Sequence, residues 1–320
     1  MSHTFKMFLF LGLLLLSFTF LNLCLGAVNL SWSQVSGGFF QGSDHYFAIH
    51  EYRLPRILIG IIVGAMLAAA GVLIQGVIRN PLASPDILGV SHGAGLAAVV
   101  VMILFPRVSI YWLSGATLMG GFFSAVLLAV ILRGNTSSVR VAVTGVALTA
   151  LYSSAIDFLV LTQPLEINNV LLWLTGSLWG RGYSQLIMIL PWCLLLPLSF
   201  WLSHSLDLLG LGDERATSLG ISANKVRFLA LLLAVAMTSA AVSVCGPLNF
   251  LGLVAPHLAR KLFGGRHQIL LPSAMLVGSL LLLLADLIAR TIDPPIELPA
   301  GILTAIIGAP YFLYLLIKIR

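Results

Sequence analysis

The sequence predicts an all-α, polytopic membrane protein with about ten transmembrane helices. Of its 320 residues, 59% are hydrophobic and only 9% are charged, and the mean hydropathy is +1.04. This composition leaves too little polar surface for a soluble domain of this size. A helix needs about 20 apolar residues to cross the hydrocarbon core of a bilayer. The runs that approach this length are 7–27, 57–78, 87–105, 110–132, 141–162, 185–203, 226–245, 247–263, 269–289 and 299–317.

The first run, 7–27, allows two interpretations. Lys6 precedes it and Leu25-Gly26-Ala27 ends it, a pattern that a cleaved signal peptide would also show. Its apolar stretch is longer than the about 7 to 15 residues of such signals, which favours a retained first helix. The next interval, residues 28–56, contains several aromatic residues suited to the membrane interface. We expect this interval to lie flat on the outer surface.

A charged segment interrupted by proline, from Arg79 to Gly89, separates the second run from the third. Gln75 and Arg79 precede the break on one helical face, and Gly93 and Gly95 follow it on the next helix. Such a segment joins two spans where both can move. Polar groups beside glycines that allow close packing indicate a transport pathway.

The interval 163–184 lies between the fifth and sixth runs. Its apolar residues at 167, 170, 171 and 174 have the spacing of a short amphipathic helix. Pro164 and Gly176 predict where this helix begins and ends. It could be a lid over a pore or an interfacial connector with no gating role, and the sequence leaves both open.

The interval 204–225, after the sixth run, predicts a rigid projection from the membrane. Asp213 can cap a short helix, Gly220 can end it, and Ser222 can cap the following span. Two capped elements in one loop would give a soluble motor protein a firm surface to grip.

The last three runs contain few charged residues. The eighth, 247–263, is short and contains His257 and Arg260. The ninth contains Asp286, and Arg290 lies at its outer end. Asp286 and Arg290 are four residues apart, so they can pair on one helical face. The scarcity of carboxylates within the spans argues against coupling to an ion gradient.

Lysine and arginine residues predict the orientation, because positively charged loops resist translocation. With the amino terminus in the cytoplasm, most of the 17 basic residues are cytoplasmic. An even number of spans then returns the carboxyl terminus to the same side. No soluble domain is appended, so we expect residues 1–320 to form a single transmembrane domain, with the interval at about 204–225 on the cytoplasmic side.

The chain shows no recognised catalytic or metal-binding motif. None of its lysines follows a glycine, so it lacks a P-loop for nucleotide hydrolysis. It also lacks the H-E-x-x-H motif of zinc proteases and the G-x-S-x-G motif of serine hydrolases. Its three cysteines show no C-x-x-C spacing and predict neither disulfides nor a zinc site. We therefore expect no enzymatic activity, no catalytic residues and no bound cofactor or metal.

Several motifs follow one another in order along nearly the whole chain. They are Arg53-Leu54-Pro55-Arg56, Arg79-Asn80-Pro81-Leu82-Ala83-Ser84-Pro85, Gly246-Pro247, Pro256-His257, Ala285-Asp286, Glu297-Leu298-Pro299 and Gly308-Ala309-Pro310. In these motifs the chain resembles the FecCD-type permease family, which comprises the membrane subunits of type II ABC importers for ferric siderophores, haem and cobalamin. Residues 168–181 and 264–267 most resemble the ferric citrate importers of that family.

The resemblance implies a permease of the bacterial inner membrane that imports an iron(III) chelate, either ferric citrate or a related siderophore. Haem and cobalamin are alternative substrates, and an ion-coupled carrier is the alternative mechanism. The implied partners are an ABC ATPase that hydrolyses ATP, a periplasmic substrate-binding protein and a second, non-identical permease subunit. No role in nucleic-acid binding is implied.

The resemblance also assigns roles to individual residues. The positions that would receive acidic residues of the binding protein are Arg53, Arg56 and Arg290. The positions that would seat in the ATPase are Gly212, Asp213, Glu214, Arg215, Ala216, Leu219 and Gly220. The positions of a cytoplasmic gate would be Asn80, Leu82, Asn135, Thr136, Ser137 and Ser138. Lipid-contacting arginines and a simple turn are the plainer alternatives for the first and last sets.

Overall fold

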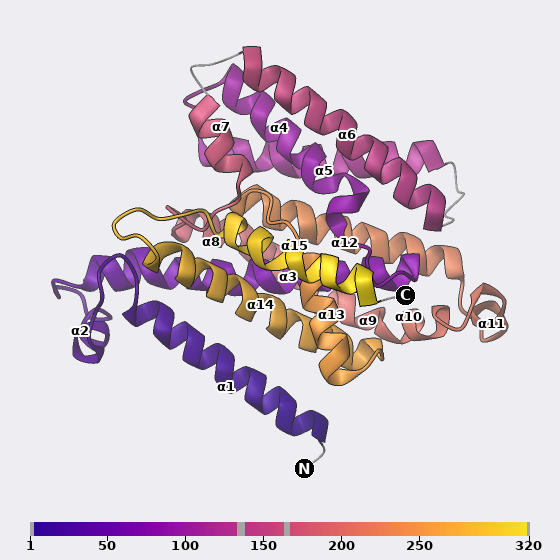
Figure 1. The fold of residues 1–320 in the computed structure, drawn as a ribbon, viewed down its shortest axis with the longest axis horizontal. Coiled ribbons are helices and arrows are strands. Elements are labelled where there is room, and N and C mark those ends of the chain that lie inside the picture. The colour runs from indigo at the N-terminus through magenta and orange to yellow at the C-terminus, as the bar shows by residue number, and fades with distance from the viewer. Residues whose placement is uncertain (1–2, 133–137, 163–166, 319–320) are drawn as a thin grey trace.

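The computed structural model describes residues 3–132, 138–162 and 167–318, and every named element in these ranges is helical (Figure 1). The long helices are α1 (His3–Cys24), α3 (Leu54–Ile78), α5 (Ile110–Leu132), α6 (Ser138–Thr162), α12 (Ala223–Cys245), α14 (His267–Thr291) and α15 (Ala300–Lys318). The shorter ones are α2 (Trp32–Gly37), α4 (Val90–Leu104), α7 (Ile167–Leu174), α8 (Tyr183–Ile189), α9 (Leu195–Trp201), α10 (Ser203–Leu209), α11 (Asp213–Ser218) and α13 (Leu251–Phe263). One π-helical and two 3₁₀ segments complete the set: η1 (Phe47–Arg53), η2 (Pro85–Leu88) and η3 (Leu190–Leu194).

The predicted all-α membrane fold is confirmed. In the described ranges, eight helical segments are long and apolar enough to cross a membrane, and α4 is a shorter apolar helix. The predicted span 247–263 corresponds to α13, which has 13 residues and therefore rises only about 20 Å. The hydrocarbon core is about 30 Å thick. The predicted number of about ten thus agrees roughly, with two of the ten segments short.

Helix α3 lies at the centre of the bundle, and α12, α13 and α14 pack around it. Glycines permit this packing. A Cβ on Gly71 would lie 1.8 Å from the carbonyl oxygen of Gly252 in α13, and one on Gly64 would lie 2.6 Å from that of Gly278 in α14. Small residues let helices approach at backbone distance where lipid offers no hydrophobic driving force for association.

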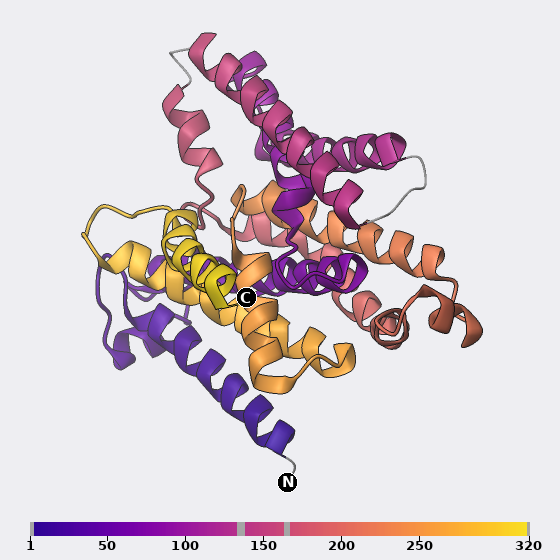
Figure 2. The ribbon, with the colours of Figure 1, turned by 45° about the vertical axis from the view of Figure 1, so that its right-hand side comes forward.

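Two groups of helices flank this centre. Helices α4, α5 and α6 pack together on one side, and α1 lies along α14 on the other, as Figures 1 and 2 both show. Apolar side chains such as Phe122, Phe123 and Ile131 of α5 are exposed. A protein in water rarely exposes such surface, whereas lipid or a neighbouring membrane subunit would cover it.

The two ends of the bundle carry different features. Helix α11 projects at one end and α2 lies at the other (Figure 1). The terminal ends of α1 and α15 both point toward the α11 end, an arrangement that agrees with an even number of crossings. Which side of the membrane these ends occupy stays a prediction.

The amphipathic helix predicted after the fifth run is confirmed as α7. Val170 and Trp173 are buried, whereas Leu171 and Leu172 are exposed. Gly176, the predicted stop, follows it with φ +69°, a conformation that residues with a Cβ rarely adopt. The choice between lid and connector stays open.

Candidate functional site

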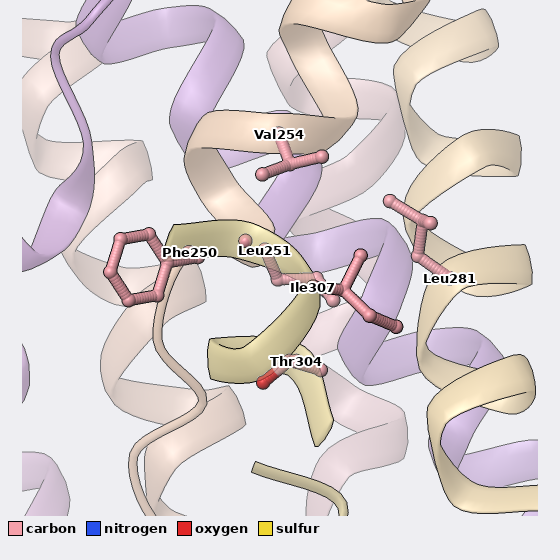
Figure 3. A pocket seen from close by; sticks show the side chains of 7 residues that line it. Phe250, Leu251, Val254, Leu281, Thr304 and Ile307 are labelled. Atoms are coloured by element: carbon pink, nitrogen blue, oxygen red, sulfur yellow. The ribbon is translucent and has the colours of Figure 1, made fainter. Parts of the chain in front are cut away.

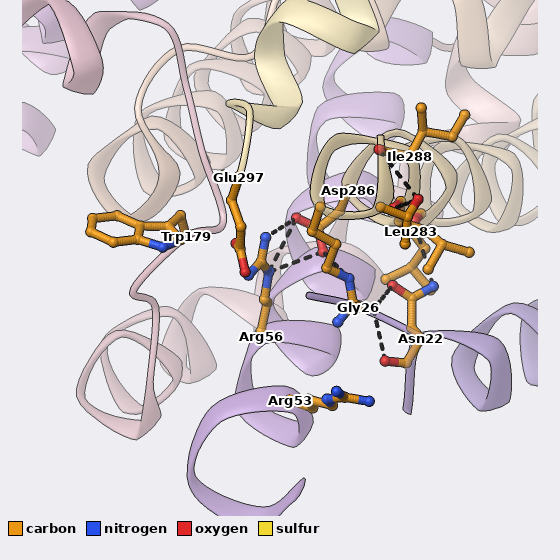
Figure 4. Close-up of polar contacts among 12 residues, drawn as sticks. Asn22, Gly26, Arg53, Arg56, Trp179, Leu283, Asp286, Ile288 and Glu297 are labelled. Carbon is orange, nitrogen blue, oxygen red and sulfur yellow. Dashed lines mark hydrogen bonds and ion pairs between the residues drawn. The ribbon is translucent and has the colours of Figure 1, made fainter. Parts of the chain in front are cut away.

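Four charged side chains from distant parts of the sequence meet at the α2 end of the bundle (Figure 4). Nη2 of Arg56 lies 2.8 Å from Oδ1 of Asp286, and Nη1 lies 2.6 Å from Oε2 of Glu297. Arg290 is the fourth member, with Nε 3.8 Å from Oδ2 of Asp286. A buried charge is tolerated only when it is paired and hydrogen-bonded, and the two carboxylates meet that requirement for Arg56.

The other guanidinium contacts join this cluster to the last turn of α1 and to the segment that follows it. Nη2 of Arg290 donates to the backbone oxygen of Asn22 at 2.7 Å and to its Oδ1 at 2.6 Å. Arg53 donates to the backbone oxygens of Leu23, at 2.5 Å, and Val28. These bonds satisfy carbonyl groups at and beyond the end of a helix, which otherwise need water.

The three arginines predicted to receive the binding protein are therefore buried: Arg53, Arg56 and Arg290 are 5%, 1% and 2% exposed. Such burial excludes a plain contact with lipid phosphates. The docking role stays a prediction, since each guanidinium is hydrogen-bonded within the chain. The predicted Asp286–Arg290 pair is present, but Arg56 lies closer to Asp286 than Arg290 does.

The projecting helix α11 is joined to two long helices through one carboxylate. Asp213 accepts hydrogen bonds from Nη2 of Arg227 in α12, at 2.7 Å, and from Nη2 of Arg79 at the end of α3. These arginines, Arg227 first, hold the pKa of Asp213 below its ordinary value. The predicted capping role of Asp213 is wrong, because Gly212 occupies the cap position with φ +110°. Asp213 instead connects α11 to the spans.

Helix α11 ends as the sequence predicts. Gly220 has φ +83°, and its N–H donates to the carbonyl of Thr217 while the N–H of Ile221 donates to that of Ala216, both at 2.9 Å. This pair of bonds is a Schellman motif, which satisfies the last carbonyls of a helix. Ser222 occupies the cap position of α12, as predicted, but its side chain makes no capping hydrogen bond.

The predicted gate residues are only partly described. Oδ1 of Asn80 accepts the N–H of Leu82 at 2.9 Å and so stabilises the turn between α3 and η2. Asn80 is exposed and Leu82 is half-buried. Asn135, Thr136 and Ser137 lie outside the described residues, and Ser138 is placed only as the first residue of α6. Their gating role stays a prediction.

Two hollows lie beside the segment that joins α7 to α8. One is a cavity of about 410 Å³ whose lining includes Trp173, Trp179 and Arg181. The other is a groove of about 610 Å³ along α15, with Thr175 and Gly301 in its lining. Both volumes fall within the about 300 to 1,000 Å³ of small-molecule sites, so each is large enough to be a candidate binding site.

A third cavity, under α15, is a packing gap (Figure 3). Its volume is about 10 Å³, and its lining of seven residues includes Phe250, Leu251 and Ile307, with Thr304 contributing a hydroxyl group. That volume barely admits one water molecule, which needs about 10 to 15 Å³. No chelate could bind there.

Comparisons with known proteins agree with this architecture. Residues 13–318 match the model of the FecCD transport family. The chain is 50% identical over 313 residues to the Fe(3+) dicitrate transport system permease protein FecD of Escherichia coli, and the match covers 98% of this chain and 98% of the relative. It is 45% identical over 312 residues to the Fe(3+)-citrate import system permease protein YfmE of Bacillus subtilis, which covers 96% of this chain and 93% of the relative.

A solved structure of a transporter also matches the chain over nearly its whole length. It is described as an inward-facing conformation of a metal-chelate type ABC transporter and has a TM-score of 0.87 to this chain at 33% sequence identity. The match covers 98% of this chain and 99% of that one. The chain therefore belongs to the FecCD transport family.

Proposed function

We propose that this chain is the transmembrane permease subunit of an ATP-driven importer that moves ferric citrate, or a related iron(III) siderophore, from the periplasm to the cytoplasm. The observation that carries this proposal is the 50% identity to FecD of Escherichia coli over 98% of both chains. Since the similarity extends over the whole membrane domain, it includes every span that could line a pathway.

The chain would act with soluble and membrane partners in the bacterial inner membrane. An ABC ATPase, as a separate chain, hydrolyses ATP, a periplasmic binding protein delivers the chelate, and a second, non-identical permease subunit completes the passage. The permease itself performs no chemistry and holds no cofactor. Both of its termini lie in the cytoplasm, on the side of α11.

Binding protein and ATPase would act at opposite ends of the bundle. The binding protein docks at the α2 end, over Arg53, Arg56 and Arg290. The ATPase contacts α11, whose Asp213 bonds to two arginines join it to α3 and α12. Movement of α11 is thereby carried to two spans and opens the inner gate at Asn80 and Leu82.

Passage also requires that the chelate be held weakly. The groove along α15 is lined by small and aliphatic residues, among them Gly301, Ala305 and Ala309, with Thr175 and Asn249 as polar members. A pathway must bind its solute well enough to admit it and weakly enough to release it, and such a lining offers few strong contacts.

Reconstitution tests the proposal. The permease pair and the ATPase are placed in proteoliposomes with the binding protein outside, and accumulation of radiolabelled ferric citrate is measured against competing siderophores, haem and cobalamin. We expect accumulation that requires ATP and the binding protein. Accumulation of haem or cobalamin alone would reject the substrate, and abolition of uptake by an ionophore with ATP intact would reject ATP as the energy source.

A further inference from the structure

The cavity of about 410 Å³ beside Trp179 has the character of a ligand site. It lies between the α4–α5 connection, α7 and the segment before α15. Phe105, Trp173 and Trp179 supply aromatic walls, and Ser177 and Arg181 are among its few polar members. Apolar walls with a small number of placed polar groups are typical of sites that bind small molecules.

Arg181 contributes a positive charge that no carboxylate of the described chain neutralises. Its Nε donates weakly to the backbone oxygen of Ser177, at 3.4 Å, and among the described residues no carboxylate oxygen lies within 4.0 Å of its nitrogens. Glu297 lines the same cavity, but its carboxylate already accepts from Arg56 at 2.6 Å and Tyr52 at 3.2 Å.

The guanidinium of Arg181 is also partly dehydrated. It is half-buried, and this burial lowers its pKa from the ordinary value. Arginine nevertheless keeps its charge in proteins. A cation that has lost water and gained no carboxylate is in an unfavourable state, which an anionic ligand in the cavity would relieve.

The backbone holds the Arg181 segment in a fixed position. The N–H of Ser177 donates to the carbonyl of Cys245 at 2.7 Å, and that of Gly301 donates to the carbonyl of Gly176 at 2.9 Å. Gly176 has φ +69°, and a Cβ there would lie 2.1 Å from the carbonyl oxygen of Pro247. A side chain on a fixed backbone binds its ligand with a smaller loss of conformational entropy.

Iron(III) citrate matches this arrangement chemically. Citrate carries three carboxylates, so its iron(III) complexes are anions with carboxylate oxygens at their surface. A guanidinium binds carboxylate through two parallel hydrogen bonds, and the two tryptophans offer flat apolar surfaces. The cavity also adjoins the α15 groove, since Ser177 and Pro299 line the cavity while Thr175 and Gly301 line the groove.

We propose that Arg181, in the cavity walled by Trp173 and Trp179, contacts the carboxylates of the anionic iron chelate after its release from the binding protein and before it enters the α15 groove. This inference rests on the proposed function and adds to it a residue that favours negatively charged chelates. It differs from the docking prediction, because Arg181 acts on the chelate and not on the binding protein.

The test uses the complete importer in proteoliposomes, with radiolabelled ferric citrate delivered by increasing amounts of loaded binding protein. Three variants are compared: Arg181→Gln removes the charge, Arg181→Lys keeps it, and Arg107→Gln removes an exposed arginine from the α4–α5 connection that does not line the cavity. Loss of one charge-assisted contact predicts a maximal uptake rate about tenfold lower for Arg181→Gln.

The expected pattern separates substrate contact from other roles. Lysine keeps the charge but cannot form the two parallel hydrogen bonds, so the uptake rate of Arg181→Lys should lie between those of wild type and Arg181→Gln. Arg107→Gln should equal wild type, and the half-saturating concentration of binding protein should be unchanged in all three. Three results would overturn the inference and leave the proposed function intact. They are wild-type uptake by Arg181→Gln, a loss in Arg181→Lys as large as in Arg181→Gln, and a raised half-saturating concentration of binding protein. If the wild-type importer takes up no ferric citrate, the proposed substrate itself is wrong and the inference falls with it.

Discussion

The guanidinium of Arg56 contacts both carboxylate oxygens of Asp286, although 230 positions separate the two residues in the sequence. Nη2 lies 2.8 Å from Oδ1, and Nε lies 3.0 Å from Oδ2. The pair joins the first turn of α3 to the last part of α14 at a point where both side chains are 2% exposed. It is therefore a structural link in the permease as well as part of the predicted docking surface.

Removing one member of this pair should destabilise the protein. Arg56→Met leaves the Asp286 carboxylate buried, with Arg290 at 3.8 Å as its remaining cationic neighbour. Breaking a buried ion pair in this way costs about 3 to 5 kcal/mol. The measurement is the midpoint of thermal unfolding of the purified complex in detergent.

The double variant Arg56→Met with Asp286→Leu is the control. It removes both charges of the pair, and an apolar pair can replace a buried ion pair at little cost. Glu297 and Arg290 still lose their partners Arg56 and Asp286, so this variant should recover only part of the lost stability. Equal midpoints for wild type and Arg56→Met would show that the pair contributes nothing to stability. The charge could then serve docking alone.

A Cβ at Gly71 should separate α3 from α13. In Gly71→Ala the added atom would lie 1.8 Å from the carbonyl oxygen of Gly252, and this backbone cannot rotate away as a side chain could. Overpacking of this kind costs about 1 to 3 kcal/mol or more, so unfolding should begin at a lower temperature.

Gly12→Ala is the matched control for this change. Gly12 is also helical, and nothing lies within 4 Å of the position of its Cβ. Alanine has the higher helix propensity, by about 1 kcal/mol, so this variant should be as stable as wild type or slightly more so. If both alanine variants unfold alike, α3 and α13 do not pack as closely as described.

Much of the fold can be predicted from sequence because its main determinants are local. Hydrophobic length defines the spans, the spacing at 167, 170, 171 and 174 defines α7, and Gly220 defines the end of α11. The interruption of the sixth span into α8, η3 and α9 was not predicted, although Pro191 within it is a signal that could have found it.

The candidate site is less predictable because its partners are distant in sequence. Asp286 and Arg290 share one helix, so their pairing follows from helical spacing. Arg56 and Glu297 are 241 positions apart, and no local rule brings them together. No local pattern in the sequence marks Arg181. The absence of a carboxylate near it among the described residues emerges from the packing of four separate segments.

The link between α11 and the spans should depend on the charge of Asp213. Asp213→Asn keeps the shape of the side chain but loses the ionic attraction of Arg227 and Arg79. This carboxylate is 49% exposed, so its ion pairs should contribute only about 0.5 to 1 kcal/mol. We therefore expect the uptake per ATP hydrolysed to fall about two- to fivefold. Asp44→Asn, an exposed carboxylate at the α2 end, is the control and should match wild type.

The pH dependence of that link follows from the lowered pKa of Asp213. A carboxyl group whose pKa is lower in the folded state stabilises that state above its ordinary value, about 3.9, and loses the effect as pH falls through the lowered value. The Asp213 contact should therefore be constant between about pH 6 and 8. A difference between wild type and Asp213→Asn that changes across this range would contradict the assignment.

Coupling should also require the backbone shape at both ends of α11. Gly212 and Gly220 have φ +110° and +83°, values that β-branched residues adopt only with strain of about 1 to 3 kcal/mol. Nothing lies within 4 Å of either Cβ position, so Gly212→Val and Gly220→Val should act through the backbone and shift α11 without disturbing the core. We expect reconstituted complexes that hydrolyse ATP but no longer accumulate chelate. Gly115→Val is the control, because Gly115 lies in α5 with a helical backbone and also has nothing within 4 Å of its Cβ position. This variant should transport normally. Normal transport by the two α11 variants would instead mean that α11 only connects α10 to α12.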